Sequence, residues 1–300
     1  MTKATAAFAS SICAAIVWLF ATSTVSIPPA GAAAGVARFR LRVFRFVDGT
    51  RAIRLPDGRR VPRPLETVVR CPATPGRHPL IVFAHGFALT PATYHHLLDA
   101  WAQAGYVVAT PVFPLTTANA PGGPDEADIV NQPRDMSFVI TKLLAENARA
   151  RGVLADRIDP SQIAVAGHSD GGVTALAVAY DRRFRDARVH AAVVLSGAAI
   201  PGMGPFPPRG PPLLAVQGTA DTINAPGTTA AYFRLARRPK FLLWLLGASH
   251  RPPYTAQQPQ LGIVERATVA FLDHYLRGSP LRALDDAARR PGLTRLTADP

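Results

Sequence analysis

The sequence predicts an α/β fold in which a mostly parallel, doubly wound sheet carries helices on both faces. Three observations support this prediction. Short apolar runs of strand length alternate along the chain with longer amphipathic segments of helical length. Glycines and prolines separate these segments, and the connections have the length of right-handed crossovers between parallel strands. In such a sheet a functional site lies at the carboxyl ends of the strands.

Residues 1–34 are expected to form a secretory signal peptide. Lys3 precedes an uncharged apolar stretch, densest over residues 12–21, and small residues such as Ala30 and Ala32 follow it. A retained membrane anchor is the alternative, because the stretch approaches spanning length. We therefore expect a secreted or cell-envelope protein, with one folded domain over residues 35–278 and a partly ordered C-terminal tail over residues 279–300.

The composition favours a large folded core, since 48% of the 300 residues are hydrophobic. The formal net charge is +13, and nearly all of the positive charge is arginine. A basic balance favours anionic lipid surfaces, acidic polymers or nucleic acid. No nucleic-acid motif accompanies the charge, so we expect a solvated basic surface, no nucleic-acid partner, and an anionic envelope surface as a candidate contact. We also expect a monomer.

Two strands are expected before the first central strand. Residues 36–47 alternate arginine with apolar side chains, which indicates a strand with one charged and one apolar face. Charge on an outer strand also blocks pairing with other chains. Asp48 and Gly49 are expected to end this strand in a turn. A second strand follows over residues 65–71 and includes Cys71, expected to be half-buried and to form no internal disulfide.

The remaining elements follow the alternation. Residues 79–85 form a continuous apolar run, typical of a strand buried on both faces. Further strands are expected over residues 106–113, 158–166, 190–195, 212–216 and 241–246, and helices over residues 91–104, 134–151, 171–180, 225–236 and 262–276. Residues 114–132 are expected to form a polar loop.

The chain is organised around the segment Gly167-His168-Ser169-Asp170-Gly171, which matches the pattern G-x-S-x-G. In this pattern a serine stands on a sharp turn between a strand and a helix, with its hydroxyl above the sheet. The strained backbone brings the residues two places before and after the serine close together, so both must be glycine. The helix that follows aims free backbone N–H groups at negative charge beside the serine.

A serine hydroxyl is a weak nucleophile, so a histidine must take its proton and a carboxylate must orient that histidine. Ser169, Asp221 and His250 follow one another in the chain order serine, acid, histidine, each just past an apolar strand. They are the expected catalytic residues. Each has an alternative role: Asp221 could cap the next helix, and His250 could be an ordinary loop residue. His168 could pack behind the serine turn.

Charge on a reacting carbonyl oxygen needs two donors, expected to be the backbone N–H groups of Asp170 and Phe87. The Asp170 side chain is expected to turn toward the helix N-terminus, where negative charge is favoured. Residues 198–212 are too few for a large helical lid, so residues 116–130 are the expected cover of the site. Candidate substrate-binding residues are Phe87, Tyr94, Ile200, Phe206 and Ile223.

The segments PLIVFAHGF, AVAGHSDGG, LLAVQGTADTI and LLGASH resemble the α/β-hydrolase superfamily. Within it they are similar to dienelactone-hydrolase-like, cutinase- and polyester-hydrolase-like, and chlorophyllase-like esterases, over residues 40–278. The resemblance implies a serine-dependent carboxylic ester hydrolase with its catalytic domain over residues 35–278 and no metal or organic cofactor. The chain departs from two of these groups, because dienelactone hydrolases use a cysteine nucleophile and polyester hydrolases usually carry methionine where Asp170 stands.

We therefore expect an exported esterase or lipase-like hydrolase that acts on small-molecule or lipid-like esters through an acyl-enzyme intermediate. Two alternatives remain open. One is a serine peptidase, which would share the three catalytic residues. The other is a non-catalytic envelope protein of hydrolase fold whose basic face binds an anionic polymer.

Overall fold

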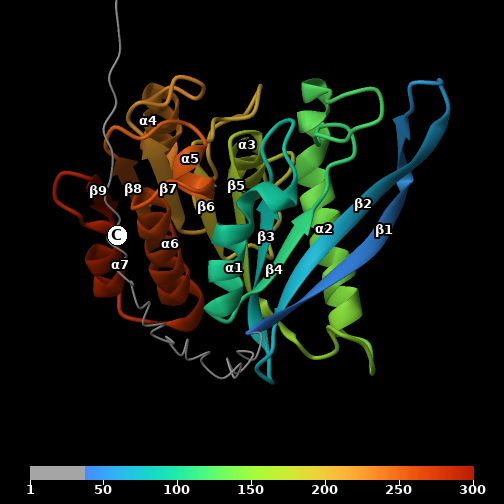
Figure 1. Ribbon diagram of the computed structural model, residues 1–300, viewed down its shortest axis with the longest axis horizontal. Helices are drawn as coiled ribbons and strands as arrows, with labels where there is room; N and C mark the ends of the chain where they lie inside the picture. Colours follow the sequence, from blue (N-terminus) through green and yellow to red (C-terminus); the bar gives the residue numbers. More distant parts are fainter. Residues whose placement is uncertain (1–37) are drawn as a thin grey trace, which may run out of the picture. The chain divides into compact units, whose positions relative to one another are not determined.

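The computed structural model describes residues 38–300, which form one nine-stranded sheet flanked by helices (Figure 1). The strands are β1 (Phe39–Arg54), β2 (Arg60–Pro72), β3 (His78–Ala84), β4 (Val107–Pro111), β5 (Ile158–His168), β6 (Ala191–Leu195), β7 (Leu213–Gly218), β8 (Lys240–Leu245) and β9 (Thr294–Asp299). The helices are α1 (His95–Gln103), α2 (Gln132–Asn147), α3 (Asp170–Tyr180), α4 (Pro226–Leu235), α5 (Pro252–Thr255), α6 (Gln260–Arg277) and α7 (Arg282–Ala288). Two short 3-10 turns, η1 (Pro91–Tyr94) and η2 (Glu126–Asn131), precede α1 and α2.

The strand order β1-β2-β4-β3-β5-β6-β7-β8-β9 confirms the predicted doubly wound sheet. The strands from β4 to β8 in this order pair in parallel. The outer pairs β1 with β2, β2 with β4, and β8 with β9 are antiparallel. Parallel strands with their helices between them place the carboxyl ends of β3, β5, β7 and β8 along one edge of the sheet.

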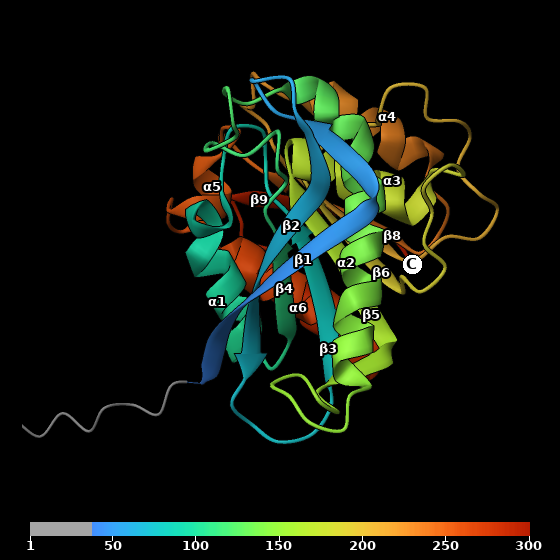
Figure 2. The same ribbon diagram turned by 90° about the vertical axis from the view of Figure 1, so that its right-hand side faces the viewer.

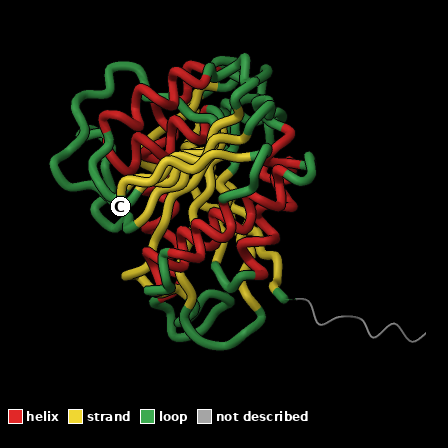
Figure 3. Tube along the Cα trace, turned by 90° about the vertical axis from the view of Figure 1, so that its left-hand side faces the viewer, coloured by secondary structure: helices red, strands yellow, loops and turns green. Residues whose placement is uncertain are grey.

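Helices cover both faces of the sheet (Figures 2 and 3), and a separate hydrophobic core forms on each face. Side chains alternate along each strand, so Leu80 and Val82 of β3 belong to one core and Ile81 and Phe83 to the other. Residues of α2, α3 and α4 fill the first core, and residues of α1, α6 and α7 fill the second. Burial on both faces explains why these strands are continuously apolar.

The hairpin of β1 and β2 is longer than expected. Asp48 does not end β1: its carboxylate accepts hydrogen bonds from the Thr50 N–H at 2.9 Å and from Arg51 Nε at 2.6 Å. This arrangement fits a register irregularity between Asp48 and Ala52, and the strand then continues. Three apolar side chains of β1 that do not face the first core are about half exposed: Leu41, Val43 and Val47.

A buried charge cluster joins this hairpin to α2. Arg63 of β2 is 2% exposed and its Nη2 lies 2.6 Å from Asp135 of α2, with Asp128 also within hydrogen-bond distance. Burial alone would lower the pKa of Arg63, but the hydrogen bonds that Arg63 donates to Asp135 and Asp128 outweigh it and raise that pKa. Arg63 therefore stays charged, and the ion pairs hold β2 against α2.

Residues 279–300 differ from the expected tail. They form α7 and then β9, which pairs with β8 over the whole register from Lys240↔Asp299 to Leu245↔Thr294. Leu284 and Leu296 are buried in the second core. The C-terminal segment therefore covers the outer edge of β8 and belongs to the folded domain.

Two other expectations concern burial and the N-terminus. Cys71 is 6% exposed, so it is more buried than expected, and it is a free thiol in the described part of the chain. The signal-peptide expectation lies outside the described residues. Within residues 38–300, no helix is long and apolar enough to span a membrane.

Candidate active site

The serine turn between β5 and α3 has the strained geometry that the motif requires. Ser169 has φ 57° and ψ −123°, a left-handed conformation that is rare for a residue with a side chain. A Cβ atom added at Gly167 would lie 2.0 Å from the Gly171 oxygen, and one added at Gly171 would lie 2.0 Å from the Ala84 oxygen. Both positions therefore exclude any side chain, and the backbone carries the serine to the carboxyl edge of the sheet.

The structure brings Ser169, His250 and Asp221 together. His250 Nε2 lies 2.8 Å from Ser169 Oγ, and His250 Nδ1 lies 2.8 Å from Asp221 Oδ2. With Nδ1–H donating to the carboxylate, Nε2 is free to accept the hydroxyl proton of Ser169. The three side chains come from the ends of β5, β7 and β8, so the parallel sheet itself aligns them.

Asp221 is held as a charged carboxylate. Its Oδ1 accepts hydrogen bonds from the backbone N–H groups of Ile223 at 2.9 Å and Asn224 at 3.0 Å, and its Oδ2 accepts one from Gln217 Nε2 at 3.0 Å. Burial favours a higher pKa, but the hydrogen bond and charge of His250 outweigh it, so the pKa of Asp221 is lowered. The alternative capping role is not observed, because Ala225 is the N-cap of α4.

A neutral hydrogen-bonded chain connects three loops behind the serine. The Gly86 N–H donates to Tyr94 Oη at 3.1 Å, and Tyr94 Oη lies 2.8 Å from His168 Nδ1. His168 Nε2 lies 2.9 Å from the His250 carbonyl oxygen. Because a carbonyl only accepts, Nε2 carries the proton, and Tyr94 donates to Nδ1.

This chain stays uncharged at neutral pH. Burial and the neighbouring His250 lower the pKa of His168 to about 3, and burial raises the pKa of Tyr94. His168 thus does pack behind the serine turn, as its alternative role predicted. The sequence does not show that Tyr94 is its partner, since 74 residues separate the two.

The loop after β3 carries a backbone N–H, that of Phe87, which faces the serine turn without an acceptor among the described residues. Gly86, Ala88 and Leu89 all donate, to Tyr94 Oη, to the Thr116 oxygen and to the Gly86 oxygen. Among the hydrogen bonds of residues 38–300, the N–H of Phe87 has no acceptor, and neither has that of Asp170. These are the two groups expected to bind an oxyanion.

A second buried histidine orients the Phe87 N–H. His85 Nδ1 lies 2.9 Å from the Gly86 oxygen, and His85 Nε2 accepts a hydrogen bond from the Phe113 N–H at 3.2 Å. Burial lowers the pKa of His85 to about 4, so the ring is neutral and Nδ1–H donates. The Gly86 carbonyl and the Phe87 N–H belong to one planar peptide unit, so holding the oxygen fixes the direction of the N–H.

The Asp170 side chain, expected to turn toward the helix N-terminus, makes no hydrogen bond there. It caps no backbone N–H, and its buried Oδ2 has no hydrogen-bond partner among the described residues. Burial, and then the negative charge of Glu126, raise the pKa of Asp170 to about 6. The helix N-terminus therefore does not hold this carboxylate by a direct contact, and desolvation outweighs the favourable dipole.

A pocket of about 660 Å³ opens over the three side chains, and we name it the Ser169 pocket. Of the candidate substrate-binding residues, Phe87 and Ile223 line it. Tyr94 and Ile200 are almost fully buried and Phe206 stacks on Tyr180, and none of these three lines the Ser169 pocket. The other residues of the wall were not among the predicted substrate-binding residues: Leu89, Glu126, Thr222, Asn224, Ser249, Arg251 and Pro252.

The expected cover contributes little to this pocket. Of residues 116–130 only Glu126 lines it, while Thr116 and Thr117 are buried against the loop after β3. No helix is inserted between β6 and β7, so that connection holds no helical lid. The pocket is therefore open to solvent above the serine.

A mostly parallel sheet with a serine on a strand-to-helix turn, followed in the chain by an acid and a histidine, has the architecture of the α/β-hydrolases. Comparison with known families narrows this class. The model of the chlorophyllase family matches residues 49–226, more than half of the chain, and the chain belongs to that family. The resemblance to chlorophyllase-like proteins is thereby confirmed.

A relative supports the same placement. Chlorophyllase-1 of Arabidopsis thaliana is 32% identical over 123 residues, which are 41% of this chain and 35% of that protein. The similarity thus spans about a third of the relative's length. The range matched by the family model includes Ser169 and Asp221 and ends before His250, and the contacts described above place His250 beside both.

Proposed function

We propose that this protein is a carboxylic ester hydrolase in which Ser169 is the nucleophile, His250 the general base and acid, and Asp221 the residue that orients His250. The observation that carries the proposal is the line of contacts from Ser169 Oγ to His250 Nε2 and from His250 Nδ1 to Asp221, each 2.8 Å long. Membership of the chlorophyllase family supports hydrolase activity.

In the first half-reaction Ser169 Oγ attacks the ester carbonyl carbon while His250 Nε2 takes the hydroxyl proton. The carbonyl oxygen becomes an oxyanion and accepts hydrogen bonds from the N–H groups of Phe87 and Asp170. The C–O bond to the alcohol then breaks, and His250 returns the proton to the departing alkoxide. The product is an alcohol and an ester of the acyl group with Ser169.

In the second half-reaction water takes the place of the alcohol. His250 Nε2 removes a proton from water, and the hydroxide attacks the acyl carbon. The oxyanion forms again between the same two N–H groups. When it collapses, the bond to Ser169 Oγ breaks, His250 returns the proton to that oxygen, and the carboxylic acid leaves.

Labelling and turnover test the proposal together. The protein should react with a fluorophosphonate probe and hydrolyse p-nitrophenyl butanoate, and Ser169→Ala should abolish the labelling and lower turnover at least about a thousandfold. The matched control is Ser161→Ala, which changes an exposed serine at the opposite end of the same strand. Normal labelling of Ser169→Ala, or equal losses in both variants, would contradict the assignment.

The substrate panel separates the remaining alternatives. We include esters of graded acyl length, chlorophyll because the family and the relative are named for it, and peptides. Turnover of peptides but not esters would favour a peptidase. No turnover and no labelling, together with binding to an anionic polymer, would favour the non-catalytic envelope protein.

We also propose that the chain is exported, on the grounds of the apolar N-terminal stretch and the small residues after it. N-terminal sequencing of the protein recovered from culture medium and from membranes tests this. A new N-terminus near residues 32–34 is the expected result. An intact N-terminus on membrane-bound protein would identify an anchor.

A further inference from the structure

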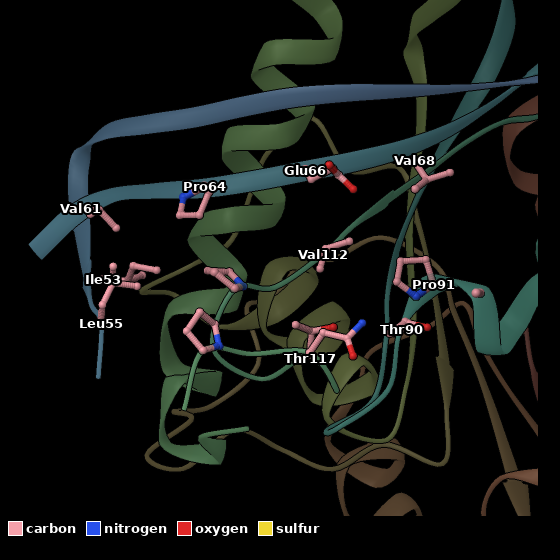
Figure 4. Close-up of a pocket in the computed structure, with 14 residues that line it drawn as sticks. Ile53, Leu55, Val61, Pro64, Glu66, Val68, Thr90, Pro91, Val112 and Thr117 are labelled. Carbon is pink, nitrogen blue, oxygen red and sulfur yellow. The ribbon is translucent and has the colours of Figure 1, made fainter. Parts of the chain in front are cut away.

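A second cavity, which we name the hairpin pocket, lies apart from the Ser169 pocket. It has a volume of about 550 Å³ and shares no lining residue with the Ser169 pocket. Figure 4 shows side chains of the hairpin, among them Ile53, Pro64 and Val68, facing Thr90, Pro91 and Thr117. Its volume lies within the range of roughly 300–1,000 Å³ typical of small-molecule sites.

The wall of the hairpin pocket is apolar and stiff. Ten of its fourteen lining residues are apolar, and four of those ten are prolines. Prolines restrict the backbone, so the shape needs little ordering when a ligand enters. The polar members are Glu66, Thr90, Thr117 and Asn119. The Thr117 hydroxyl already donates its hydrogen bond within the protein, to the Leu89 oxygen at 3.2 Å.

The fold holds this cavity open. On β2 the side chains of Arg63, Leu65, Thr67 and Val69 are buried, while Pro64, Glu66 and Val68 lie on the opposite face and line the pocket. On the opposite, buried face Arg63 donates to Asp128 and Asp135, which holds β2 against α2 and leaves Pro64, Glu66 and Val68 turned toward the hairpin pocket.

One short segment separates the two pockets. Phe87 and Leu89 line the Ser169 pocket, and Thr90 and Pro91 line the hairpin pocket. A Cβ atom at Gly86 would lie 3.3 Å from Leu89 Cδ1 and 3.3 Å from Ser169 Cβ, so Leu89 lies beside the nucleophile. Thr90, the first residue of this segment to line the hairpin pocket, follows Leu89 directly. Its Cα atom is therefore only about 3.8 Å from that of Leu89.

We propose that the hairpin pocket binds the aliphatic acyl chain of the ester substrate. This chain passes over Leu89 while Ser169 attacks the ester carbonyl carbon. The proposal rests on the proposed function. An aliphatic chain suits the cavity because it removes apolar surface from water and makes no demand for hydrogen bonds. A short acyl group fills only the Ser169 pocket, so the hairpin pocket gives preference for long chains.

Paired variants of two facing strand residues test this. Val68 lies in the hairpin pocket, and its partner across the strands, Val43, lies outside it and is half exposed. Val68→Asn should lower kcat/KM for p-nitrophenyl dodecanoate about tenfold and leave that for the butanoate within about twofold. Ala92→Trp, which fills the pocket from an exposed position, should do the same. Val43→Asn should change neither value.

Binding measured without turnover separates this proposal from the proposed function. In the Ser169→Ala variant a dansyl-labelled undecanoate probe should bind as in the unchanged protein, and Val68→Asn should weaken it at least about fivefold. That pattern, even without ester turnover, supports the hairpin pocket alone. Equal effects of Val43→Asn and Val68→Asn, or unchanged preference for the dodecanoate in Val68→Asn and Ala92→Trp, would overturn the proposal while leaving ester hydrolysis intact.

Discussion

Replacing Asp170 with asparagine should stabilise the protein, and the gain should depend on pH. Burial and Glu126 raise the pKa of Asp170 from 3.8 to about 6. The folded protein therefore binds this proton more tightly than the unfolded chain, so stability is lost as pH rises from about 4 through about 6. Asparagine carries no charge and avoids that loss.

The shift sets the size of the effect. A rise of about two pKa units corresponds to about 3 kcal/mol above pH 6, and partial exposure of the carboxyl lowers this to about 2 kcal/mol. For a domain of this size about 2 kcal/mol raises Tm by roughly 4–8 °C. The gain should vanish below about pH 4, where Asp170 is protonated in both states.

Thermal unfolding from pH 4 to pH 8 measures this directly. The control is Asp286→Asn, which changes an exposed aspartate of α7 whose carboxylate makes no hydrogen bond with the described residues. A gain at pH 8 that persists unchanged at pH 4, or no gain at pH 8, would refute the reasoning. Asp286→Asn should leave Tm the same within about 1 °C.

The same variant should raise turnover above pH 6. An ionised Asp170 places negative charge beside an N–H that binds the oxyanion, which opposes the transition state. The ratio of kcat/KM for Asp170→Asn over the unchanged protein should therefore be near one at pH 5 and several-fold at pH 8. A fall of several hundredfold would mean that the carboxylate acts directly in the reaction.

Three further predictions concern contacts at a distance from Ser169. Tyr94→Phe removes the hydroxyl that donates to His168 and accepts from the Gly86 N–H. It should lower kcat about tenfold with KM nearly unchanged, because about 1–3 kcal/mol of hydrogen bonding is lost beside the Phe87 N–H. A lower Tm with unchanged kcat would speak against a positioning role for Tyr94. Arg63→Met should lower the free energy of unfolding in urea at pH 7 by about 3 kcal/mol, the low end for a broken buried ion pair, because Asp128 and Asp135 lose its guanidinium while Arg51 Nη2 stays 2.7 Å from Asp135. An unchanged midpoint would contradict this. Leu296→Ala should cost about 2 kcal/mol and speed amide exchange in β9; protection equal to that of the unchanged protein would show that β9 does not depend on this contact.

The central sheet and the three aligned residues could be predicted because their causes are local. A strand buried on both faces needs an unbroken apolar run, as in residues 79–85, and a left-handed serine needs glycines two places away on each side. The order serine, acid, histidine at strand ends then follows from the parallel topology. Each of these signals lies within a few consecutive residues.

The features that were missed depend on residues far apart in the chain. Tyr94 is an aromatic residue of the kind that often lines pockets. Only the approach of His168 and Gly86 in the folded chain makes it a buried hydrogen-bonding group. Four of the six residues 294–299 are polar or charged, and pairing with β8 makes them a strand. Within residues 38–300 the buried Oδ2 of Asp170 has no hydrogen-bond partner, and no sequence pattern reports that.

The hydrogen bond of His168 to residue 250 is made with the main-chain oxygen and not with a ring nitrogen of the imidazole. The anchor of the loop and the group that moves protons are therefore separate parts of one residue. During turnover the ring can pivot between the serine oxygen and the leaving oxygen while its point of attachment stays still, and no proton need pass into the scaffold behind it.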